Sequence, residues 1–180
     1  MTYVALLRAI NLAGRAAVAM SDLRDLFTAL GFSGVRTVLQ SGNVVFRGSA
    51  RSIATVERTL EAETVKRLGV QTDFFVRNAA EWQRLVEHNP FRKEALSDPG
   101  RLLAVVLKRA PAQRDIDALQ AVIKGREIVR AGDKHAYIVY PDGVGRSRLT
   151  SALIEQKLGT RGTGRNWNTV LKLAALVSAE

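Results

Sequence analysis

The sequence predicts an α+β protein made of two ferredoxin-like α-β plaits packed together, with extra helices at the linker and the C-terminus. Two observations predict this fold. The first half shows segments in the order β-α-β-β-α-β, which is the order of one plait, and the second half begins the same series again. A turn-rich stretch over residues 89–100 separates the halves. We therefore expect an N-terminal domain over residues 1–88 and a C-terminal domain over residues 89–180.

In the first half, short apolar and β-branched runs alternate with helical spacing. A helix opens near Ser21 and carries Leu23, Leu26, Phe27 and Leu30 on one face. Ser41-Gly42 lies between two β-branched runs, which indicates a tight hairpin. The expected strands are residues 3–10, 35–40, 43–47 and 71–77, and the second helix covers about residues 52–68.

Near the end of the first half, Asn78 and Glu81 form a capping-box pattern that opens a third helix. The second half repeats the signals of the first. A second hairpin is expected around Gly132-Asp133, and Ser147 is expected to cap a later helix. The expected strands are residues 102–107, 127–130 and 136–140, and the expected helices contain Ile116 to Ile123, residues 147–158, and the segment from about residue 166 onward.

The composition is that of an ordinary folded protein. Of 180 residues, 47% are hydrophobic and 24% are charged, and there is no cysteine. The lack of cysteine excludes a disulfide framework and a thiol nucleophile. The apolar run from Tyr3 to Leu7 is too short for a membrane span or a signal sequence. We therefore expect a cytoplasmic protein that is not bound to a membrane.

The net charge of +10 is concentrated in the second half. Residues 1–90 carry eleven Lys and Arg against eight Asp and Glu, whereas residues 91–180 carry sixteen against nine. Such an excess attracts phosphate-bearing partners, including nucleic acid. Alternatively, most of these side chains lie on solvated helix faces.

Two C-terminal segments combine glycine, arginine and amide side chains. In Gly143–Arg148, the arginines Arg146 and Arg148 lie at the expected start of a helix, where a cation opposes the helix dipole. This placement indicates an anion between them, held also by Ser147. The second segment contains Arg165, which is followed by two candidate caps of the last helix, Asn166 and Asn168. There Trp167 either anchors the helix in the core or exposes its indole to a ligand.

Four residues of the first half are candidates for the opposite wall of the same site. Arg8 ends an apolar strand, so it either reaches a ligand or lies in solvent beyond the strand. Asn11 follows in a long loop that could close over a ligand or merely connect two elements. Ser41 and Asn43 suit a tight turn, and their side chains could also hold a polar group at the rim of the sheet.

Patterns for common catalytic machinery are missing from the sequence. The two histidines, His88 and His135, lie far apart without ligand-spaced neighbours, so we expect no metal site. No Gly-x-Ser-x-Gly elbow is present, and Gly143–Ser147 lacks the spacing of a phosphate-binding Walker loop. We expect no cofactor, and the sequence leaves open whether the protein is an enzyme.

Several short motifs follow one another along the chain. They are residues 8–14, 30–37, Gln40-Ser41-Gly42-Asn43 with 44–46, 89–91, 125–127, 145–147, and Arg165-Asn166-Trp167-Asn168-Thr169 with Val170. Together these motifs resemble one bacterial family, the one called domain of unknown function 1697. The resemblance covers nearly the whole chain and implies a pair of α/β plait domains, with no assigned activity. Ala9 and Ala13 depart from it, because the family pattern usually has glycine there.

Three functional hypotheses follow from the sequence. The first is binding of a small phosphorylated or otherwise anionic ligand, with Arg146 and Arg165 gripping the anion. The second is a nucleic-acid-binding module that uses the basic second half. The third is a passive interaction domain without a ligand.

Overall fold

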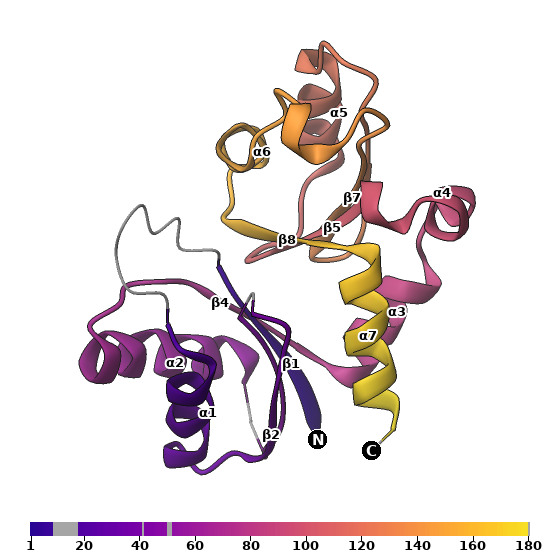
Figure 1. Ribbon diagram of the computed structural model, residues 1–180. Helices are drawn as coiled ribbons and strands as arrows, with labels where there is room; N and C mark the ends of the chain where they lie inside the picture. Colours follow the sequence, from indigo (N-terminus) through magenta and orange to yellow (C-terminus); the bar gives the residue numbers. More distant parts are fainter. Residues whose placement is uncertain (9–17, 41, 50–51, 180) are drawn as a thin grey trace. The chain divides into compact units, whose positions relative to one another are not determined.

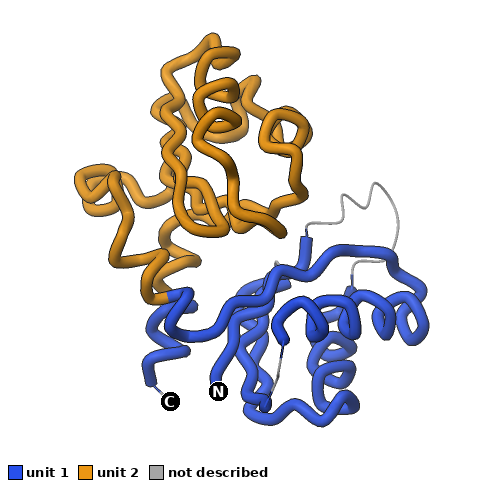
Figure 2. Tube along the Cα trace, turned by 180° about the vertical axis from the view of Figure 1, so that it is seen from behind, with its two compact units in different colours: residues 1–82, 173–180 blue, residues 83–172 orange. Residues whose placement is uncertain are grey.

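The computed structural model describes residues 1–8, 18–40, 42–49 and 52–179. The chain divides into two compact units, shown in Figure 2: unit 1 comprises residues 1–82 and 173–180, and unit 2 comprises residues 83–172. Each unit contains a four-stranded antiparallel sheet with helices, so the protein is α+β with two plait-like domains. This agrees with the fold class that the sequence predicts.

Unit 1 is a complete plait. Its strands lie in the order β2-β3-β1-β4, and every neighbouring pair is antiparallel. Figure 1 shows helices α1 and α2 on one face of this sheet. Its elements are β1 (Thr2–Leu7), α1 (Met20–Ala29), β2 (Ser33–Val38), β3 (Asn43–Arg47), α2 (Ile53–Leu68) and β4 (Phe74–Asn78).

The helices of unit 1 begin and end at local sequence signals. The hydroxyl oxygen of Ser52 accepts a hydrogen bond from the Thr55 N–H and caps α2, and Gly69 ends that helix with a φ of 66°. Between the sheet and the two helices, the aromatic rings of Phe27 and Phe46 pack edge to face at 5.0 Å. The core therefore lies on the helical side of the sheet.

Two helices lie in the chain between the two plaits. Helix α3 (Ala79–Glu87) follows β4 directly. Its capping box is formed as predicted, because Asn78 Oδ1 accepts from the Glu81 N–H at 2.8 Å while a Glu81 carboxylate oxygen accepts from the Asn78 N–H at 2.9 Å. Helix α4 (Arg92–Ser97) lies in the turn-rich stretch and is followed by the short 3-10 turn η1 (Pro99–Arg101).

Unit 2 repeats the topology. Its strands lie in the order β6-β7-β5-β8, again antiparallel throughout. Residues on one face of this sheet, among them Val105 and Ala136, form a core with α5 and α6. Its elements are β5 (Leu102–Leu107), α5 (Gln113–Val122), β6 (Ile128–Ala131), β7 (His135–Val139), η2 (Val144–Arg146), α6 (Ser151–Leu158) and β8 (Gly162–Asn166). Helix α7 (Trp167–Ser178) follows β8 and begins in unit 2, whereas its residues from Leu173 onward belong to unit 1.

Two sequence expectations for unit 2 are wrong. No strand is expected before the last helix, yet β8 pairs with β5 and completes the second plait. The expected helix from Ser147 begins only at Ser151, and its N-cap is Thr150, whose hydroxyl oxygen accepts from the Leu153 N–H at 3.3 Å. Residues 144–146 form the separate turn η2, and the backbone of Ser147 is extended.

Candidate functional site

The segment between β7 and α6 contains Ser147, whose hydroxyl group joins two parts of unit 2. It donates a hydrogen bond to Glu127 Oε1, and its oxygen accepts from the Leu149 N–H at 3.0 Å. The Glu127 side chain folds back against Gly125, where an added Cβ would meet its carboxylate. Ser147 thus ties the segment before α6 to the segment before β6.

The helix-dipole argument for Arg146 and Arg148 does not hold. Because α6 begins at Ser151, both arginines precede its first turn, and the dipole field is felt only within the first and last turns. The evidence for a site at these arginines is instead the cavity that they line.

Arg146, Ser147 and Arg148 line a cavity of about 430 Å³, which we call the cationic cavity. Its other charged lining residues are Lys124, Glu127 and Asp142. Apolar side chains complete the wall, namely those of Val122, Ile123, Leu149 and Leu153.

The lining of the cationic cavity has more positive charge than uncompensated negative charge. Among the described residues, Lys124, Arg146 and Arg148 form no ion pair within 4.0 Å. Asp142, by contrast, is bound by both Nε and Nη2 of Arg126. This hydrogen bonding lowers the pKa of the Asp142 carboxyl, with smaller Coulomb contributions from Arg101 and Arg146. The negative charge of Asp142 is therefore largely compensated by a residue outside the lining.

Arg165 does not belong to the cationic cavity. It lies in β8 opposite Ala104, on the sheet face away from the core that contains Val105. Its side chain is buried, and Nη1 donates to Thr163 Oγ1 at 2.8 Å and to the Gly164 carbonyl at 2.9 Å. Burial lowers the pKa of the Arg165 guanidinium to about 10, so it remains charged at neutral pH. The structure therefore does not bring Arg165 and Arg146 into one cavity.

The residues after Arg165 have structural positions. Asn166 is the cap of α7, because its Oδ1 accepts from the Thr169 N–H at 3.0 Å. Trp167 is buried against Tyr137, with ring centroids 6.4 Å apart, so the indole anchors the helix. Asn168 is exposed in the first turn of α7.

In unit 1, Arg8 lies just beyond the end of β1 at Leu7, half-buried, and its Nη1 is 3.3 Å from Asp73 Oδ2. Asn43 is fully buried, and its Nδ2 donates to the Val38 carbonyl at 2.9 Å, which closes the turn between β2 and β3. Asn11 and Ser41 lie outside the described residues, as do Ala9 and Ala13.

Of the predicted site residues, the structure thus brings Arg146 and Ser147 together in one cavity. Sequence reasoning missed Lys124 and Glu127, which come from the loop between α5 and β6, and Asp142, which lies in the same β7–α6 segment as Arg146 and Ser147. The Gly125-Arg126-Glu127 motif was the available signal, because it adjoins Lys124 and supplies the partners of both Ser147 and Asp142.

Two further features of the described ranges concern metals and membranes. No three His, Cys, Asp or Glu side chains gather there as a metal ion would require. Nor does any helix in these ranges have the length and apolar character needed to cross a bilayer.

Comparisons with known proteins agree with the fold. A family model described as "Protein of unknown function (DUF1697)" matches residues 1–137. A solved structure of a conserved bacterial protein from Streptococcus pneumoniae is similar over 98% of both chains, with a TM-score of 0.75 and 20% sequence identity. At that identity the likeness shows the fold alone. No curated protein matches the sequence.

Proposed function

We propose that this chain, which belongs to the DUF1697 family of proteins of unknown function, binds a small anion in the cationic cavity of unit 2. The observation that carries the proposal is the imbalance of charge in that cavity. Lys124, Arg146 and Arg148 line it without an ion pair, while Arg126 compensates Asp142 from outside.

A phosphate or carboxylate group suits these cations. Guanidinium groups donate two parallel hydrogen bonds to such an anion, and charge-assisted bonds are stronger than neutral ones. The Glu127 carboxylate repels an anion, but one of its oxygens already accepts a hydrogen bond from the Ser147 hydroxyl group. We therefore place the anion at Arg146 and Arg148, with Lys124 as the third donor. The apolar wall leaves room for an uncharged part of the ligand.

The test is calorimetric titration of the intact protein with pyrophosphate at low salt. We expect binding in the millimolar range or tighter, and we expect Arg146→Ala and Arg148→Ala each to weaken it about tenfold, the value of one charge-assisted hydrogen bond. Folding should be retained, because both side chains are exposed. Arg114→Ala is the matched control, since Arg114 is exposed on α5 away from the cavity. Unchanged affinity in both cavity variants would refute the proposal.

A second titration with single-stranded RNA separates a small-ligand site from a nucleic-acid surface. Binding that involves many phosphates weakens steeply with salt, by roughly one unit of log-log slope for each contact. A few cations in one cavity give a shallow dependence. Tight RNA binding with a steep slope, unaffected by Arg146→Ala, would favour the nucleic-acid alternative over the cationic cavity.

A further inference from the structure

Strand β8 has glycines where the equivalent strand β4 has large apolar side chains. Both are the fourth strand of their plait and pair antiparallel with its first strand. Phe74 begins β4 and Val76 is its third residue, and both are buried in the core of unit 1. Gly162 and Gly164 hold the same two positions in β8.

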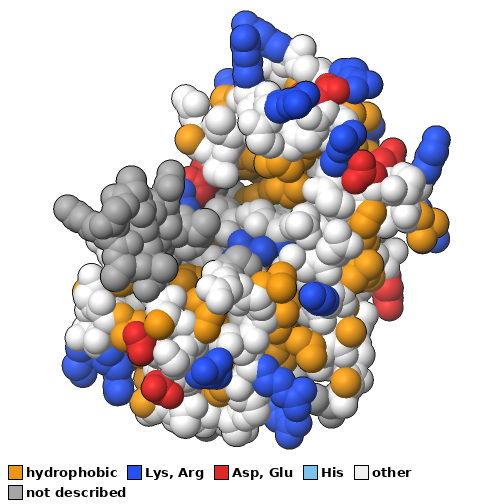
Figure 3. Space-filling view, in the orientation of Figure 1, with side chains coloured by type: hydrophobic (Ala, Val, Ile, Leu, Met, Phe, Trp, Pro, Cys, Tyr) orange, Lys and Arg blue, Asp and Glu red, His pale blue; other side chains and the backbone are white. Residues whose placement is uncertain are grey.

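Gly162 and Gly164 both line a cavity of about 190 Å³ between the sheet and α6, which we call the glycine hollow. Leu103 and Val105 form its floor, Ile154 lines it from α6, and Tyr140 closes it from the end of β7. Figure 3 shows hydrophobic surface at the bottom of a recess in unit 2 beside α6. An apolar cavity of about 150 Å³ takes up benzene, so this space suits one six-membered ring.

The rim of the glycine hollow offers hydrogen-bonding groups. Glu155 of α6 accepts from the Gly162 N–H at 3.0 Å. The Gly164 N–H points to the same open edge, because alternate residues of a strand share a direction. Within the described part of the chain, no side chain is hydrogen-bonded to it. The hydroxyl-bearing residues Thr150 and Ser151 also line the space, so a ring with oxygen substituents fits better than a purely apolar one.

The glycine hollow adjoins the cationic cavity. Ser147 and Leu149 line both. A molecule can therefore place an anionic group in one compartment and an uncharged group in the other.

We propose that the ligand is a monosaccharide phosphate, whose phosphate binds at Arg146 and Arg148 and whose sugar ring enters the glycine hollow. This inference rests on the proposed anion site and adds the chemical class of the uncharged part of the ligand. A sugar ring has an apolar C–H face for Leu103 and Val105, and oxygens for the Gly164 N–H and the hydroxyl-bearing rim.

The test compares glucose 6-phosphate, whose sugar is a six-membered pyranose ring, with inorganic phosphate in wild type and in Gly164→Val. Gly164 does not have a positive φ, and a Cβ there would lie 3.3 Å from the flexible end of Leu103, so a β-branched residue fits the strand. We expect wild type to bind the sugar phosphate about tenfold more tightly than phosphate. Gly164→Val should remove that preference while phosphate affinity stays unchanged.

Gly164→Ala provides a second variant if the valine disturbs folding, with a smaller loss of preference in the same direction. Gly100→Ala is its matched control, because Gly100 lies outside the hollow and a Cβ there would come no nearer than 3.8 Å to Asp98. Phosphate binding without any sugar preference, or a preference that survives Gly164→Val, would overturn this inference and leave the anion site intact. Absence of binding by both compounds would overturn the anion site, and this inference with it.

Discussion

The fourth strands of the two plaits, β4 and β8, both end in an arginine followed by an asparagine. In both, the asparagine side chain caps the next helix: Asn78 Oδ1 accepts from the N–H three residues later at 2.8 Å, and Asn166 Oδ1 does so at 3.0 Å. Both arginines are buried, and each donates from Nη1 to the preceding carbonyl, at 2.7 Å for Arg77 and 2.9 Å for Arg165. The two strand ends are built alike.

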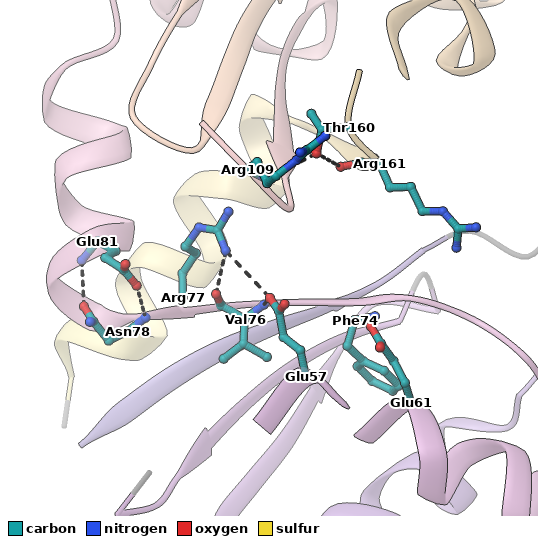
Figure 4. Close-up of polar contacts among 10 residues, drawn as sticks. All are labelled: Glu57, Glu61, Phe74, Val76, Arg77, Asn78, Glu81, Arg109, Thr160 and Arg161. Atoms are coloured by element: carbon teal, nitrogen blue, oxygen red, sulfur yellow. Dashed lines mark hydrogen bonds and ion pairs between the residues drawn. The ribbon is translucent and has the colours of Figure 1, made fainter. Parts of the chain in front are cut away.

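The two plaits differ in the helix beside these strands. In unit 1, Glu61 accepts from the Phe74 N–H at 3.0 Å, and Glu57, one turn earlier in α2, accepts from the Val76 N–H at 2.7 Å. Figure 4 shows Glu57 also directed at Arg77, with 3.9 Å between Oε1 and Nη1. Carboxylates of α2 thus occupy the outward N–H groups of Phe74 and Val76.

In unit 2, the first of these bonds has a counterpart from Gly162 to Glu155, whereas one turn earlier α6 has Ser151, which carries no carboxylate. The plait therefore folds with or without the second carboxylate and with or without large side chains on its fourth strand. In unit 1 these groups close the edge, whereas their replacement in unit 2 leaves a cavity. This contrast is why we place the sugar ring beside β8 in unit 2.

The largest loss of stability is expected at Glu57, whose place in α6 of unit 2 is taken by Ser151. Glu57→Ala should lower the free energy of unfolding by about 3 kcal/mol, because it leaves a buried arginine and a strand N–H without this acceptor. Ser151→Ala, at the corresponding place in α6, should change it by less than about 0.5 kcal/mol, as expected for an exposed side chain. Urea unfolding followed by circular dichroism measures both. Equal losses would show that the two edges do not differ in this way.

Smaller losses of stability, equal in the two units, are expected at the asparagine helix caps that both units share. Asn78→Ala and Asn166→Ala should each cost about 1 kcal/mol of stability, because each removes the side-chain acceptor of a helix cap. Asn168→Ala is the control, since Asn168 is exposed and caps nothing in the described structure. If only one of the two substitutions lowered the stability, the two asparagine caps would not be energetically equivalent, although their backbones are arranged alike.

The smallest effect concerns acid stability at the rim of the cationic cavity. Hydrogen bonding from Arg126 lowers the pKa of Asp142, so this pair stabilises the folded state above the ordinary aspartate pKa of about 4. That contribution disappears as the pH falls through the lowered pKa. Thermal melts between neutral and acidic pH should show a slightly smaller acid-induced loss of stability in Arg126→Ala than in wild type. A larger loss in the variant would contradict the sign.

Structural features that depend on a few neighbouring residues were predicted correctly from the sequence. The Asn78–Glu81 capping box needs only a four-residue pattern, and it forms as expected. The order of the first six elements was likewise readable from apolar periodicity.

Strand β8 was not predicted because Gly-Thr-Gly is a poor strand sequence, and it becomes a strand through pairing with β5. Ser147 has the residue type of a helix cap, but so does Thr150, and the turn η2 decides between them by delaying the helix to Ser151. Propensity alone does not rank two such caps within one turn.

Local patterns in the chain were enough for the α+β class, the repeated plait and the basic character of the second half, because periodicity, caps and charge are properties of neighbouring residues. The partners of Arg165, Ser147 and Asp142 depended on the folded chain. Strand register turned Arg165 away from the α5 and α6 side, and the loop before β6 brought Glu127 and Arg126 to residues about twenty positions away. Such contacts depend on three-dimensional packing, which no short window of sequence contains.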